Sequence, residues 1–255
     1  MDKATLGVFG LFSGSLGKKA ALEQYEQNTM AWLAKQPGHG GKKAETELPY
    51  IEKQWELTWL QYGKANALER KLFFGGRELT AAENACEVIA VYNALLALGQ
   101  AQADAGGKKQ KYRSLPDLLY QFAKKGICLK GIFGTNPKAL EKYFREYGYR
   151  TASCKGKRIT KEALAALQQD YDTFIMTAFN EGQNPFAMVH TMSITKEKNG
   201  YRRHNDYEKV QFYETLYDAV RLYHGGRGHT FCVIAVGIHE REGVLGDTRN
   251  EKKDE

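Results

Sequence analysis

The pattern of apolar and polar positions divides the chain into a helical first part and a strand-rich second part. Residues 82–99, AENACEVIAVYNALLALG, form an apolar run that suits a buried helix. Further helices are predicted near residues 114–125, 136–147, 160–170 and 213–223. Strands are predicted over residues 174–179, 187–195, 201–205 and 230–238, with a turn at Lys198-Asn199-Gly200. Helices followed by an antiparallel sheet indicate an α+β fold.

The residues before this part predict a helical N-terminal extension over residues 1–75. Helices are expected at about 18–35 and 48–72, on either side of a glycine-rich loop at 36–43. In the second, Trp55, Trp59, Tyr62 and Leu68 are spaced as one buried stripe. The main domain is predicted over residues 76–239 and a charged tail over 240–255. Thr80 and Glu83 are spaced as a capping box at the start of the long apolar helix.

Composition excludes several classes of protein. A hydrophobic fraction of 42% and an aromatic fraction of 12% indicate a folded chain. The net charge of +7 comes from 37 basic residues interspersed with 30 acidic ones, without a basic-aromatic module, so no nucleic-acid partner is expected. None of the four cysteines forms a CxxC pair, which argues against zinc ribbons and thioredoxin-like redox sites. With no leader and no membrane-length apolar stretch, we expect a cytoplasmic protein without stable membrane insertion.

Cys86 is the first candidate for chemistry, because it falls in the first turn of the long apolar helix. A helix N-terminus lowers the pKa of a thiol, and its free N–H groups can bind an oxyanion. A small, unreactive core cysteine fits the same position. The residue alone therefore leaves both interpretations open.

His190 is the second candidate, within the apolar strand AMVHTMSI. The chain returns from the next turn as YRRHND, which brings Asn205 or Asp206 near the histidine. Either side chain could orient the imidazole, but strand alternation allows only one of them to face it. His229 begins another apolar strand and is the alternative base. A core histidine in an ordinary hairpin remains a second interpretation of His190.

The order of cysteine, histidine and asparagine resembles that of the papain-like cysteine peptidases, closest to the branch of bacteriocin-processing, double-glycine-leader peptidases. The resemblance covers roughly residues 78–239. The matching segments are NACEVIAVYNALLALG, FGTNPKALEKYFREYGYRT, FAMVHTMSI with NGYRRHND, and FYETLYDAVRLY with TFCVIAVGI. It implies a papain-like fold in which Cys86 is the nucleophile, His190 the general base and acid, and Asn205 the residue that orients His190.

The sequence departs from the family pattern beside the nucleophile. The family places a glutamine shortly before the cysteine to complete the oxyanion hole, whereas here Asn84 is the nearest amide and the oxyanion-hole candidate. Glu87 replaces the usual glycine and would raise the thiol pKa unless its side chain points away.

The function expected from the resemblance is that of a cysteine hydrolase, a peptidase that forms an acyl-enzyme on a peptide or protein substrate, without metal or organic cofactor. The alternatives are a catalytically impaired peptide-binding protein on the same scaffold and a related acyltransferase. Residues 1–41 could form a propeptide or lid, because Gly40-Gly41 is the kind of sequence that a double-glycine peptidase cleaves. The oligomeric state is left open.

Overall fold

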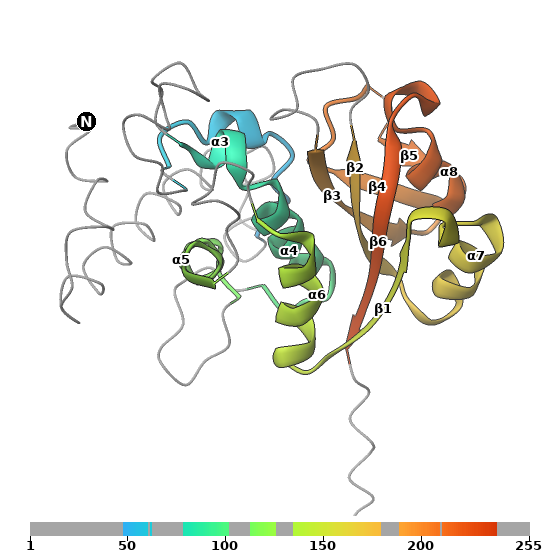
Figure 1. Cartoon of the computed structure of the whole chain (residues 1–255), viewed down its shortest axis with the longest axis horizontal. Coiled ribbons are helices and arrows are strands. Elements are labelled where there is room, and N and C mark those ends of the chain that lie inside the picture. Colours follow the sequence, from blue (N-terminus) through green and yellow to red (C-terminus); the bar gives the residue numbers. More distant parts are fainter. Residues whose placement is uncertain are drawn as a thin grey trace, which may run out of the picture.

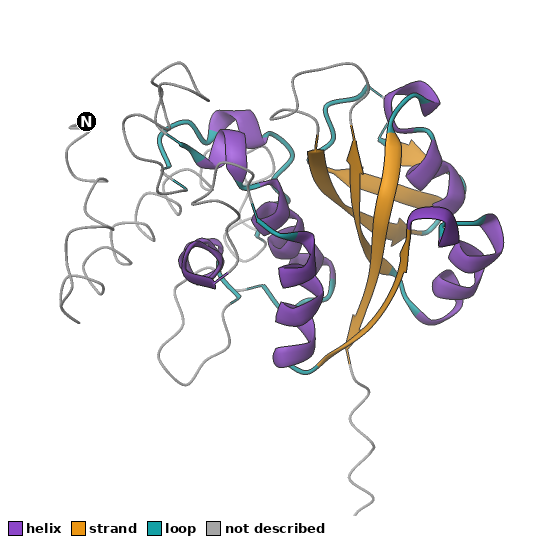
Figure 2. Cartoon of the chain, in the orientation of Figure 1, coloured by secondary structure: helices purple, strands orange, loops and turns teal. Residues whose placement is uncertain are grey.

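The long apolar run forms a helix that is buried along most of its length. In the computed structural model, which describes residues 48–60, 62, 79–101, 113–125, 135–179, 189–209 and 211–238, this helix is α4 (Cys86–Ala97). Every residue from Cys86 to Leu95 is buried. Figures 1 and 2 show why: α4 lies between one face of a sheet and the neighbouring helices α5 (Leu115–Lys125) and α6 (Pro137–Glu146). The predicted α+β class is confirmed.

The sheet has six strands in the order β1-β6-β2-β3-β4-β5, and each strand is antiparallel to its neighbours. The strands are β1 (Tyr149–Lys155), β2 (Thr173–Phe179), β3 (Val189–Glu197), β4 (Gly200–His204), β5 (Phe212–Tyr213) and β6 (His229–Ile238). The four predicted strands are confirmed as β2, β3, β4 and β6. Strands β1 and β5 were not among the predicted strands; β5 has two residues, too few to show an alternating pattern.

The two faces of the sheet support separate cores. In β2, Ile175 packs with α4, α5 and α6, whereas its neighbours Phe174 and Met176 pack on the other face. That second face is covered by α7 (Lys161–Asp170) and α8 (Leu216–Arg221), which Figure 1 shows opposite α4. Successive strand residues point to opposite faces, so a sheet buried on both sides needs apolar residues at adjacent positions.

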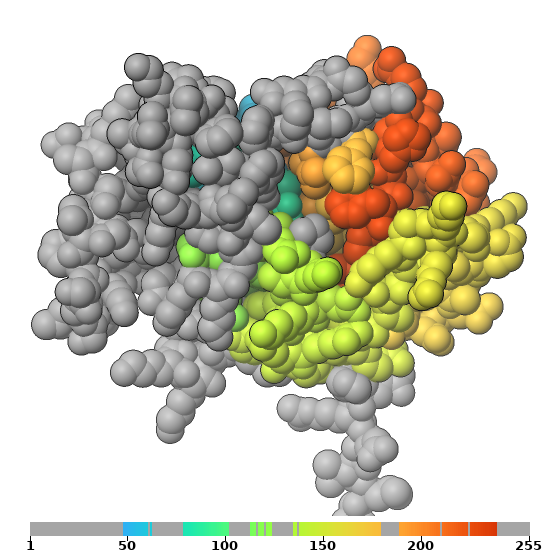
Figure 3. All heavy atoms as spheres, viewed as in Figure 1, coloured from blue at the N-terminus to red at the C-terminus, as the bar shows by residue number. Residues whose placement is uncertain are grey.

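Helix starts follow the expected chemistry where the side chain reaches the backbone. Asn136 caps α6, its Oδ1 accepting the Lys138 N–H at 2.9 Å, and Thr160 caps α7 through Ala163. In Figure 3, α6 appears in yellow-green beside the yellow segment from β1 to α7, and α6 packs on β1.

The predicted capping box at Thr80 does not form. Thr80 stands at the N-cap of a separate short helix, α3 (Ala81–Asn84), but its side chain makes no capping hydrogen bond. The chain leaves helical geometry at Ala85, and Cys86 begins α4 as its first residue.

The helix predicted over residues 48–72 is wrong for the part that the structure describes. Residues 48–60 contain only a 3₁₀ turn, η3 (Gln54–Glu56), and Trp55 is 49% exposed rather than part of a buried stripe. The 48–60 segment instead inserts Ile51, Leu57 and Leu60 into the core around α4. Its backbone is held by Asn93 of α4, whose side chain bonds both the N–H and the carbonyl of Ile51 at 2.9 and 3.0 Å.

Several predictions lie outside the described residues: the helix at 18–35, the loop with Gly40-Gly41, and the charged tail at 240–255. Among the helices that the structure describes, none is long and apolar enough to cross a membrane.

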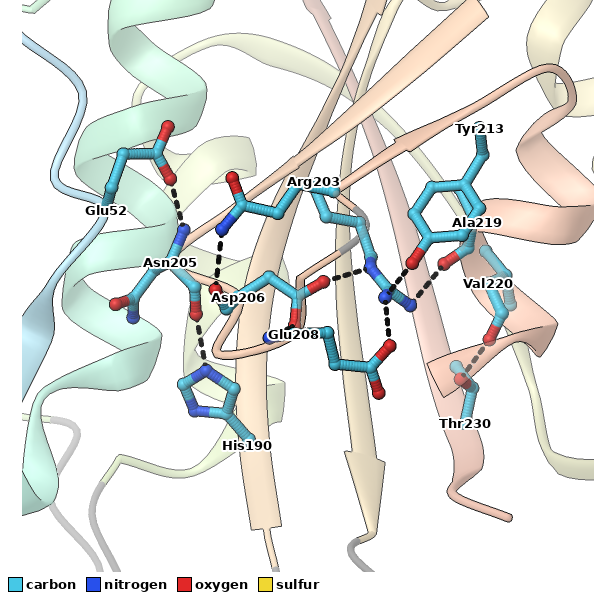
Figure 4. A network of polar contacts seen from close by, with 11 residues as sticks. Glu52, His190, Arg203, Asn205, Asp206, Glu208, Tyr213, Ala219, Val220 and Thr230 are labelled. Atoms are coloured by element: carbon cyan, nitrogen blue, oxygen red, sulfur yellow. Dashed lines mark hydrogen bonds and ion pairs between the residues drawn. The ribbon is translucent and has the colours of Figure 1, made fainter. Parts of the chain in front are cut away.

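A buried arginine fastens the loop after β4 to α8. The Arg203 side chain is fully buried, and its Nε lies 2.5 Å from Asp206 Oδ2 (Figure 4). The guanidinium also pairs with Glu208 at 3.0 Å, donates to the Ala219 carbonyl at 3.1 Å and contacts the Tyr213 hydroxyl. Burial raises the pKa of Asp206, and Arg203 opposes that effect.

We expect Arg203→Met to destabilise the fold by about 3–5 kcal/mol, because it leaves the buried Asp206 carboxylate without its counterion. Urea unfolding measures the change. Arg202→Met is the matched control: its partner Glu197 is 40% exposed, and the loss should be about 0–1 kcal/mol. Equal losses for the two variants would contradict the role given to Arg203.

Candidate active site

Cys86 lies where the start of α4 meets strand β3. Its side chain is 6% exposed, and the thiol donates a hydrogen bond to Glu87 Oε2 at 3.3 Å. The backbone N–H of Thr191 also lies at the Cys86 sulfur, where it favours the thiolate. Thr191 directly follows His190 in β3. Packing of α4 on β3 therefore brings the cysteine to the backbone of the residue that follows the candidate base, His190.

The electrostatic environment keeps the Cys86 thiol protonated. Burial, and next the Glu87 carboxylate, raise the pKa of Cys86 well above its ordinary value, against the opposing N–H groups of Thr191 and Glu87. The lowered pKa expected from a helix N-terminus is therefore not realised. Desolvation disfavours a charged sulfur, and the carboxylate repels it at close range.

Glu87 itself is an unusual carboxyl group. It is 3% exposed, and burial raises its pKa to about 7. Besides the Cys86 thiol, its Oε2 accepts the backbone N–H of Thr135 at 3.4 Å. Near neutral pH the Glu87 carboxyl therefore exchanges between its protonated and ionised forms directly beside the sulfur.

His190 has a defined orientation. Its Nε2 lies 2.7 Å from the backbone carbonyl oxygen of Asn205 (Figure 4), and the ring is 5% exposed. A carbonyl oxygen only accepts, so Nε2 carries the hydrogen, and in the neutral ring Nδ1 is the basic nitrogen. The ring stacks on Tyr207 at a centroid distance of 4.7 Å. Burial raises the pKa of Tyr207, and an ionised Cys86 would raise it further.

Asn205 contacts His190 through its backbone and not through its side chain. The side-chain amide faces Gln54, donating from Nδ2 to Gln54 Oε1 at 2.8 Å and accepting the Gln54 N–H at 3.1 Å. Asn205 adopts a left-handed conformation with a φ of 60°. The Asn205 side chain thus does not face His190 as expected, and the backbone carbonyl of the same residue does.

Asp206 and His229 lie apart from this arrangement. The Asp206 carboxylate pairs with Arg203. His229 is exposed at the start of β6, opposite Phe179 of β2, and β2 separates β6 from β3. Asn84, the oxyanion-hole candidate, is 5% exposed, and its Nδ2 has no hydrogen-bond partner. Buried amides are almost always paired, so an unpaired donor two residues before Cys86 is notable.

The sequence did not indicate Glu52, Gln54 or Tyr207 as parts of the site. Gln54 lies far before Cys86 in the chain, and its Nε2 donates to the carbonyls of Ala81 and Ala82 at 3.0 and 3.1 Å. It therefore holds α3 in place and does not supply the glutamine of the family's oxyanion hole. No local pattern marks these residues, because they meet Asn205 and His190 only through tertiary packing.

Comparison of the sequence with models of known families finds no match, and no curated protein matches it. Within the described ranges, no group of three or more His, Cys, Asp and Glu side chains is arranged to hold a metal ion.

Glu87→Gln is expected to make Cys86 more reactive, because it removes the carboxylate beside the sulfur. The pKa of Glu87 is about 7, so the two proteins should react alike at low pH and diverge as pH rises through 7. Above that pH we expect iodoacetamide to modify Cys86 of the variant about tenfold faster. Mass spectrometry of the labelled peptide measures the rate.

Glu83→Gln is the matched control, since it makes the same change at an exposed position of α3. It should leave the Cys86 rate unchanged. A rate in Glu87→Gln that equals the wild-type rate at pH 8 to 9 would contradict the assigned repulsion.

Proposed function

We propose that this protein is a papain-like cysteine hydrolase, a peptidase in which Cys86 is the nucleophile, His190 the general base and acid, and Asn205 the residue that orients His190. The observation that carries the proposal is the convergence at one point of the start of α4, strand β3 and the end of β4. Cys86 lies against Thr191, and His190, one residue earlier, is bonded to the Asn205 carbonyl. Cysteine nucleophiles need a base that is itself oriented by a third group.

The proposed reaction begins from a neutral thiol. As the Cys86 sulfur attacks the carbonyl carbon of the peptide bond, its proton passes to Nδ1 of His190. The C–N bond breaks, His190 returns that proton to the leaving amine, and an acyl-enzyme remains. His190 then takes a proton from water as the water attacks the thioester. The carboxylic acid leaves, and the Cys86 sulfur recovers its proton.

Two N–H donors, one on Cys86 and one on Asn84 two residues before it, are candidates to bind the oxyanion. The backbone N–H of Cys86 belongs to the first turn of α4, where N–H groups lack partners within the helix. Asn84 Nδ2 is a second donor that is buried without a partner. Leaving such a donor unsatisfied costs free energy in the resting protein, and an oxyanion would supply the missing acceptor.

The second candidate is a non-catalytic peptide-binding protein on the same scaffold. The observation that favours it is the raised pKa of Cys86, caused by burial and by Glu87. A related acyltransferase would use the same nucleophile with an acceptor other than water. In each case the partner is a peptide or protein, and Cys86 must stay a free thiol, as in the cytoplasm.

Limiting iodoacetamide across pH 6 to 9 distinguishes an enzyme from a binding protein. We expect Cys86 to react faster than Cys128, Cys154 and Cys232, because in the proposed site His190 accepts the Cys86 proton. His190→Ala should slow the Cys86 reaction by about 100-fold, at the lower end of a general-base contribution. His229→Ala, which removes an exposed imidazole at the start of β6, should leave the rate unchanged.

Slow and equal labelling of the four cysteines, independent of His190, would exclude the hydrolase and support the binding protein. A rate that falls in His229→Ala but not in His190→Ala would move the base to the other strand.

A further inference from the structure

We propose that Glu52 is a positioning residue of this site, which holds the Asn205 backbone so that its carbonyl fixes the tautomer of His190. The catalytic importance of Glu52 rests on the proposed function. The contacts behind the inference concern only how His190 is oriented. It adds a carboxylate from a segment that the family resemblance does not cover.

The Glu52 carboxylate contacts the backbone of Asn205. Oε2 of Glu52 accepts the Asn205 N–H at 2.8 Å, while the carbonyl of the same residue accepts from His190 (Figure 4). Asn205 is thus held by the 48–60 segment through its N–H, and it orients the His190 imidazole through its carbonyl. Groups that orient a site residue in this way contribute to activity without touching the substrate.

Asn205 needs such support. With a φ of 60° it lies in the left-handed region, which costs free energy for any residue with a side chain. Asparagine tolerates the region better than most, but the conformation persists only where the surroundings impose it. Here the Glu52 carboxylate fixes the N–H of Asn205 and Gln54 fixes its side chain.

Glu52 is itself held and charged. Its Oε1 lies 2.6 Å from Nδ1 of His204, whose Nε2 lies 2.8 Å from the Thr195 hydroxyl oxygen. Burial opposes ionisation of Glu52, but its hydrogen bonds with His204 and the Asn205 N–H, and the charge of Arg202, together lower its pKa. The Tyr50 ring stacks on His204 at 3.9 Å and closes the other side.

The 48–60 segment has a fixed position. Asn93 of α4 bonds both backbone groups of Ile51, the residue before Glu52. The same buried helix therefore carries the nucleophile at its start and, two turns later, the anchor of the segment that supports His190. A chain beginning at residue 76, where the main domain is predicted to start, would lack this support.

The test compares Glu52→Gln with Glu56→Gln, the same change in the same segment at an exposed pair with Lys53. Nitrogen NMR reports the ring tautomer of His190, assigned by comparison with His190→Gln, and iodoacetamide reports the Cys86 rate. In the wild-type protein and in Glu56→Gln we expect hydrogen on Nε2. In Glu52→Gln we expect a mixture of tautomers and a Cys86 rate reduced about tenfold.

A wild-type tautomer in Glu52→Gln, or hydrogen on Nδ1 in the wild-type protein, would overturn the inference. If Glu52→Gln does not fold, Glu52→Asp keeps the charge but draws the carboxylate away from the Asn205 N–H. It should shift the tautomer in the same direction, and an unchanged tautomer there also contradicts the inference. If the His190 tautomer shifts in Glu52→Gln but the Cys86 rate does not depend on His190, the role of Glu52 is upheld and the proposed hydrolase is excluded.

Discussion

The burial of α4 from Cys86 to Leu95 determines how the polar groups around the candidate site are arranged. A helix enclosed from Cys86 to Leu95 by a sheet and by other helices has no solvent to satisfy its polar side chains. Its polar groups are therefore satisfied only where the protein supplies a partner, and among the described residues the Tyr92 hydroxyl has none. Asn93 finds the backbone of Ile51, and Glu87 finds the thiol of Cys86. Through Asn93 the helix fixes the 48–60 segment, and through Glu87 it places a carboxyl group beside the Cys86 sulfur.

The surroundings of Cys86 and of His190 have different effects on protonation. Burial and Glu87 hold the Cys86 thiol in its neutral form, whereas the Asn205 carbonyl fixes His190 with a hydrogen on Nε2 and leaves Nδ1 as the basic nitrogen. The proposed mechanism therefore transfers the thiol proton to the imidazole during attack and does not begin from a preformed ion pair. With its pKa of about 7, Glu87 changes its own charge beside the sulfur in the physiological pH range.

Sequence patterns identified the elements whose periodicity reflects burial. The apolar run of α4 and strands β2, β3, β4 and β6 were predicted because their side chains repeat with the period of the structure. The 48–60 segment was mistaken for a helix: Ile51, Leu57 and Leu60 are buried by insertion between elements, which imitates helical spacing without helical hydrogen bonds. Cys86, His190 and Asn205 were candidates from order alone. The hydrogen bond from His190 to the Asn205 carbonyl and the contact of Glu52 with the Asn205 N–H both depend on the left-handed backbone of Asn205. The spacing of residues in the sequence does not reveal that conformation.

The proposed mechanism requires the Cys86 sulfur and the His190 ring to be neighbours, and a chemical cross-link between them measures this. Dibromoacetone carries two electrophilic carbons separated by a single carbonyl group, so it can join a thiol and an imidazole only when they are neighbours. After reaction at Cys86 and digestion, mass spectrometry should find the peptides of Cys86 and His190 joined by one bridge, and no bridge in His190→Ala. A Cys86 that is alkylated once, with its second bromide hydrolysed and His190 unmodified, would contradict the account.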